Sequence, residues 1–142
     1  MIVALDPGLK GGAAMRDEAG QLVVLPLSLY LLQPTRATHV VEEMLPVPGR
    51  SVQSTMTTAK NWGAMMSTVS RCGPTVTVHP RTWQAALGLS AGKGEAKAAH
   101  KRRIQAAMQR CYGRDVPLDL ADAAAILYWQ EQREARCVKG AA

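Results

Sequence analysis

The first six residues, Met-Ile-Val-Ala-Leu-Asp, constrain the fold most, because five apolar residues run directly into a carboxylate. A short apolar run closed by proline and glycine is typical of a buried strand. An unpaired charge at the end of such a strand is unfavourable, so Asp6 is either a surface turn residue or one arm of a site that needs negative charge. The glycines of segment 7–12 favour a site, since they let the backbone approach a ligand closely. A simple Asp-Pro-Gly turn is the alternative at this point.

Size and composition indicate one globular domain spanning residues 1–142, with 47% hydrophobic and 20% charged residues. No run approaches the ~20 apolar residues of a membrane span, and the N-terminus does not resemble a signal peptide. The three cysteines are odd in number and lack the spacing of metal ligands, which is typical of reduced thiols. We therefore expect a cytoplasmic protein with no membrane partner.

The positive charge is concentrated in one segment. The net charge is +6, and residues 93–114 hold seven lysines and arginines against one acid, Glu95, so this segment alone carries the excess. A concentrated basic segment indicates a polyanionic partner. A solvated helix face is the alternative interpretation.

The hydrophobic pattern predicts three antiparallel strands, then a helical crossover that makes the later strands parallel. The connection 29–38 has room for only a turn or two of helix, and the tail 138–142 is expected to fray. Strands are predicted at 1–6, 11–16, 21–27, 39–45 and 75–79, and helices at 53–71, 80–88, 95–112 and 118–136.

Four acids occupy positions that suggest a common site. Asp6 and Glu42 follow apolar strand residues, while the spacing of Asp119 and Asp122 places both on one helix face. Asp119 alone could be an N-cap after Pro117, whereas Asp122 lies among alanines that can pack closely on a sheet. If the first and fourth strands are neighbours and the last helix crosses them, the four carboxylates converge.

Mutually repelling carboxylates are tolerated only with cations between them. All-oxygen ligands select Mg²⁺ or Mn²⁺. Two such ions a few Å apart form a phosphodiester-cleaving centre, in which one activates water and the other stabilises the leaving oxygen. With a basic segment to hold phosphates, the pattern predicts a metal-dependent nuclease.

Three segments resemble the acidic motifs of RuvC-type Holliday junction resolvases: Asp6-Pro7-Gly8, Val40-Val41-Glu42, and residues 119–123. The stretch from His79 to Lys97 is similar to small resolvases of phages and prophages. The resemblance covers most of the chain in the right order. It implies a ribonuclease H-like α/β fold, with a mixed five-stranded sheet flanked by helices, and an enzyme encoded by a bacterium or phage.

The resemblance also implies roles for residues. Asp6, Glu42, Asp119 and Asp122 would be the catalytic ligands of two Mg²⁺ ions, for which Mn²⁺ can substitute. Glu42 is preferred to Glu43, which strand alternation places on the opposite face. The implied enzyme is a homodimer whose two sites nick symmetrically placed strands of a four-way DNA junction.

Five basic residues are candidates for DNA contacts. Lys93, Lys97 and Lys101 belong to the basic segment, whereas Arg50 and Lys60 lie beyond the fourth strand, where plain surface charge is an equal alternative.

Two features depart from the family. The connection before the fourth strand is short where the family usually has a full helix. Met44 and Leu45 occupy the place where relatives can carry an aromatic wedge. The alternative functions are another ribonuclease H-like nuclease acting on RNA–DNA hybrids or branched DNA, a non-catalytic junction-binding protein, and an actin-like or sugar-kinase-like phosphotransferase, which would need two domains.

Overall fold

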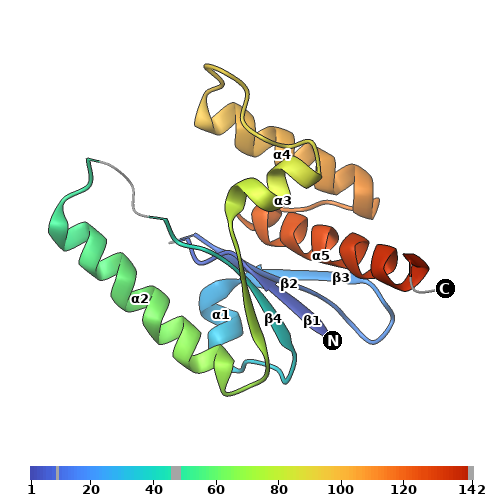
Figure 1. The fold of residues 1–142 in the computed structure, drawn as a ribbon, viewed down its shortest axis with the longest axis horizontal. Helices are drawn as coiled ribbons and strands as arrows, with labels where there is room; N and C mark the ends of the chain where they lie inside the picture. Colours follow the sequence, from blue (N-terminus) through green and yellow to red (C-terminus); the bar gives the residue numbers. More distant parts are fainter. Residues whose placement is uncertain (9, 46–48, 141–142) are drawn as a thin grey trace.

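The computed structural model describes residues 1–8, 10–45 and 49–140, which form a five-stranded sheet with helices on both faces (Figure 1). The strand order is β3-β2-β1-β4-β5. β1 pairs antiparallel with β2, as β2 does with β3, whereas β4 pairs parallel with both β1 and β5. The predicted mixed sheet is therefore confirmed. The strands are β1 (Ile2–Leu5), β2 (Gly12–Arg16), β3 (Leu22–Pro26), β4 (Thr38–Glu42) and β5 (Thr75–Val78).

The helices follow the predicted order with two differences. The last helix begins as a 3₁₀ turn, and it continues to Gly140, so the expectation of a frayed tail is wrong for residues 138–140; residues 141 and 142 lie outside the described chain. The connection before β4 is a short helix, as expected. The helices are α1 (Leu27–Leu32), α2 (Val52–Ser70), α3 (Pro80–Ala86), α4 (Lys97–Tyr112), η1 (Leu118–Leu120) and α5 (Ala121–Gly140).

Two apolar clusters cover the two faces of the sheet, with α3, α4 and α5 on one side and α1 and α2 on the other (Figure 1). Side chains alternate accordingly, since Val40 belongs to the α5 side and Val41 to the α2 side. Four alanines at the start of α5 have no exposed surface and let this helix lie close against the sheet: Ala121, Ala123, Ala124 and Ala125. Within the described ranges, no helix is both long and apolar enough to cross a membrane.

Candidate active site

The ends of two adjacent parallel strands place Asp6 beside Glu42. β1 and β4 pair with Leu5 opposite Val41, so the next residue of each strand lies at the same edge. Alternation directs both carboxylates to the face covered by α5. Asp6 is only 8% exposed, and its Oδ1 accepts a hydrogen bond of 3.0 Å from the backbone N–H of Gly8. The Asp-Pro-Gly turn therefore orients a buried carboxylate.

Glu42 is fixed by an indole from α3. Trp83 is fully buried, and its Nε1–H donates a hydrogen bond of 2.7 Å to Oε2 of Glu42. The neighbouring Glu43 accepts a 3.3 Å hydrogen bond from the side chain of Thr77. Thr77 is paired in the sheet with Val41, whose side chain belongs to the α2 side, so Glu43 lies on the face opposite to Glu42. The predicted separation of Glu42 from Glu43 is confirmed.

Asp122 reaches the same place from the first turn of α5. Its Oδ2 lies 3.6 Å from Nζ of Lys101 on α4, and both side chains are partly buried. Lys101, which the sequence suggested as a DNA contact, is thus an ion-pair partner within the carboxylate cluster.

The pKa shifts show that these carboxyl groups repel one another in a poorly solvated site. Burial, followed by the charge of Asp6, raises the pKa of Glu42 to about 8. Burial is also the main cause that raises the pKa of Asp6, with Asp122 adding to the effect. Burial raises the pKa of Asp122, although Lys101 opposes that shift. Ionisation of all three carboxyl groups at once is therefore unfavourable, and Lys101 alone does not offset their mutual repulsion.

Asp119 stands apart from this cluster. It is exposed in η1, one turn before α5, and among the charges acting on the pKa of Asp6 its effect is the smallest. The structure brings together Asp6, Glu42 and Asp122 and leaves Asp119 at the rim.

Two glycines bring the segments of the site together. A Cβ at Gly11 would lie 2.0 Å from the carbonyl oxygen of Asp6, and one at Gly12 would lie 2.6 Å from Cδ2 of Leu120. These glycines therefore permit a close approach between segments of the protein itself, whereas the sequence had suggested a close approach to a ligand. Gly11 closes the loop after Asp6, and Gly12 lets η1 pack on β2.

A basic cleft of about 730 Å³ opens onto Asp6. Three of the predicted DNA contacts line it, namely Arg50, Lys97 and Lys101, whereas Lys60 and Lys93 are exposed and lie outside its lining. Lys10, which was not among the predicted DNA contacts, also lines the cleft. The feature of the sequence that could have indicated this role is the position of Lys10 in the loop directly after Asp6.

The donor chemistry of the cluster fits a hard divalent cation. Three partly or fully buried carboxyl groups present oxygen ligands, and a divalent cation between them would offset the repulsion that keeps their pKa values raised. As placed, no three His, Cys, Asp or Glu side chains in the described part of the chain are close enough to share one ion. Asp122 would have to exchange Lys101 for the metal.

Solved structures share this fold. Thermus thermophilus RuvC is 19% identical, with a TM-score of 0.55, over 88% of this chain and 89% of that chain. T. thermophilus RuvC in complex with Holliday junction substrate is 16% identical, with a TM-score of 0.56, and the match again covers 88% of this chain and 89% of that chain. No protein-family model and no curated protein sequence matches the chain. The likeness confirms the ribonuclease H-like fold that the motif resemblance predicted.

Proposed function

We propose that the chain is a metal-dependent endonuclease that resolves four-way DNA junctions by paired phosphodiester hydrolysis. The observation that carries this proposal is the position of Asp6, which is buried with Glu42 and Asp122 and also lines a cleft with lysine and arginine side chains. A cluster of acids within basic surroundings suits a phosphodiester, because the acids need cations and the cations and lysines both attract phosphate.

Asp6, Glu42 and Asp122 would hold two Mg²⁺ ions, with Mn²⁺ as a substitute, and Asp119 would contribute from the rim. When bound, the ions supply an activated water and stabilise the leaving oxygen of the scissile bond. The hydrogen bond from Trp83 holds one oxygen of Glu42 in place and leaves the other for a ligand. The Gly8 N–H does the same for Asp6.

The basic residues of the cleft would position the substrate. Lys10, Arg50 and Lys97 line the approach to Asp6 from three different segments of the chain. Phosphate contacts of this kind fix the register of DNA without reading its sequence. Lys101 lies between the cleft and the cluster, so we expect its ammonium group to move to the substrate phosphate when a metal neutralises Asp122.

The preference for a junction rests on the fold that the chain shares with RuvC, one structure of which contains a Holliday junction substrate. Paired cleavage requires two sites, so we propose a homodimer. The exposed apolar residues of α2, among them Val52 and Met56, are available for such an interface.

Cleavage of a labelled four-way junction, beside linear duplex and an RNA–DNA hybrid, tests the proposal. Paired symmetric nicks in the junction with Mg²⁺, and none with Ca²⁺, are expected. Preferential cleavage of the hybrid would indicate a metal-dependent nuclease whose substrate is an RNA–DNA hybrid and not a junction. Tight junction binding with no product under Mg²⁺ or Mn²⁺ would indicate a binding protein instead.

A further inference from the structure

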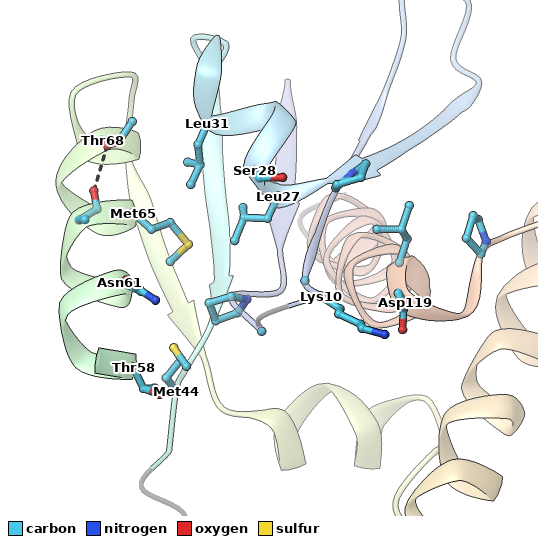
Figure 2. Close-up of a pocket in the computed structure, with 17 residues that line it drawn as sticks. Lys10, Leu27, Ser28, Leu31, Met44, Thr58, Asn61, Met65, Thr68 and Asp119 are labelled. Atoms are coloured by element: carbon cyan, nitrogen blue, oxygen red, sulfur yellow. Dashed lines mark hydrogen bonds between the residues drawn. The ribbon is translucent and has the colours of Figure 1, made fainter. Parts of the chain in front are cut away.

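A second cavity, of about 750 Å³, adjoins the basic cleft on the α2 side of the sheet (Figure 2). Its walls come from α1, α2 and the loop after β1, and its size lies within the ~300–1,000 Å³ of small-ligand pockets. Five residues border both cavities, so the two are continuous: Gly8, Lys10, Met44, Thr58 and Asn61.

The two cavities differ in chemistry. The first contains Asp6 with four basic side chains, whereas the second is walled by apolar groups such as Leu27, Leu31 and Met65. Among the described residues that line the second cavity, only Lys10 and Asp119 are charged, and their opposite charges leave this cavity without the excess positive charge of the cleft (Figure 2). A group that enters the second cavity should therefore be flat or compact, largely apolar and uncharged.

We propose that this cavity receives one unstacked nucleobase of the strand whose phosphate lies at Asp6. This inference rests on the proposed function. A nucleotide joins an anionic phosphate to an uncharged, flat base, and the adjoining basic and apolar cavities match these two parts in the same order. Met44 borders both cavities, and aliphatic side chains of this kind can separate stacked bases.

Asn61 is the residue best placed to contact the edge of the base. It projects from α2 toward the cavity at the border with the cleft (Figure 2). Its amide offers both a donor and an acceptor, so it can pair with the polar edge of a base. A base in this position would be held between apolar walls and an amide, as enzymes hold extruded bases.

The test places 2-aminopurine, whose fluorescence rises when it leaves the stack, at each nucleotide beside the nick in a four-way junction. Binding of the wild-type protein in Ca²⁺ is expected to raise the fluorescence at one of these positions. Ala64→Phe fills the cavity from an exposed position on α2 and should abolish the rise and weaken junction binding about tenfold. Ala135→Phe, at an exposed position of α5 outside the lining of both cavities, is the control and should change neither.

Asn61→Ala provides a second variant that leaves the cavity open, and it should reduce the dependence of cleavage on the identity of that base. Unchanged fluorescence at every position, with junction binding and cleavage intact, would overturn this inference and leave the proposed function standing. Sedimentation of the free protein distinguishes a nucleobase from a second copy of the chain as the occupant of the cavity. If Ala64→Phe changes the oligomeric state and not the fluorescence, the cavity is a contact between copies of the chain, and the inference is overturned. Absence of any junction binding would instead overturn the proposed function.

Discussion

The indole Nε1–H of Trp83 donates a hydrogen bond of 2.7 Å to Oε2 of Glu42, joining the middle of α3 to the end of β4. The two residues are 41 positions apart, and Trp83 has no exposed surface. The bond therefore depends on the packing of α3 against the sheet. Through this bond, Trp83 orients the carboxyl group of Glu42, which is a candidate metal ligand.

Trp83→Phe keeps most of the ring and removes the donor. We expect the free energy of unfolding to fall by about 1–2 kcal/mol, and the Mg²⁺ concentration for half-maximal cleavage to rise about tenfold, because Glu42 loses its orientation. A Mg²⁺ titration of junction cleavage measures the second effect. Trp129→Phe, at a half-buried ring beside Arg133, is the control and should leave the Mg²⁺ requirement unchanged. An unaltered requirement in Trp83→Phe would contradict this role.

The raised pKa of Glu42 predicts the pH dependence of stability in the absence of metal. Burial and the charge of Asp6 raise this pKa from 4.5 to about 8, so between these values the unfolded chain is ionised while the folded chain holds the proton. The unfolded state then binds fewer protons, and the free energy of unfolding falls as pH rises from about 4.5 to about 8, by an amount on the order of a few kcal/mol.

Glu42→Gln should remove most of this decline and be more stable than the wild type at pH 8 in EDTA. Denaturant unfolding at several pH values measures it. Glu43→Gln changes the neighbouring side chain on the opposite face and should retain the wild-type slope. A decline of equal size in Glu42→Gln would mean that other groups cause it.

The close approach at Gly11 predicts a large effect of a small substitution. Gly11→Ala places a methyl group 2.0 Å from the Asp6 carbonyl oxygen, and displacement of that backbone should destabilise the fold by about 3 kcal/mol or more. Gly63→Ala, in α2 with nothing within 4 Å, should instead stabilise it by about 1 kcal/mol. Thermal unfolding of the two variants measures these changes in stability. Equal changes in Gly11→Ala and Gly63→Ala would contradict the predicted collision at Gly11.

The lining of the basic cleft predicts which lysines contact phosphate. Lys10→Ala and Lys97→Ala should each reduce the slope of log affinity against log salt by about one unit for junction DNA. Lys60→Ala removes the same charge outside the cleft and should change the slope much less. Binding measured across a range of salt concentrations tests this. Equal slopes for all three variants would show that the cleft does not direct binding.

The strands and their directions were predictable because apolar runs, turn residues and a helical crossover mark them locally. The pairing of Asp6 with Glu42 followed from the same reasoning, since the carboxyl ends of adjacent parallel strands meet. The short helix α1 was also anticipated from the length of its segment. These features depend on neighbouring residues in the chain or on general rules of sheet topology.

The remaining features depend on contacts between distant segments. The hydrogen bond from Trp83 to Glu42 has no local signal, because the two residues are 41 positions apart in the chain. The ion pair between Lys101 and Asp122 joins α4 to α5, whereas its charge alone suggested a DNA contact. Lys10 was missed because a single lysine in a glycine-rich loop is not distinctive. Asp119 was grouped with Asp122 because of their i, i+3 spacing, but this spacing does not indicate that Asp119 is exposed while Asp122 is partly buried.

The buried carboxylate of Asp6 is the centre of this account, and Asp6→Asn tests it most directly. The substitution keeps the shape and removes the charge, so the variant should fold, bind a four-way junction as tightly as the wild type, and produce no nicks with Mg²⁺ or Mn²⁺. Cleavage and binding are measured on the same labelled junction, and thermal unfolding confirms that the variant is folded. Nicking at the wild-type rate by folded Asp6→Asn protein would contradict the assignment of this site.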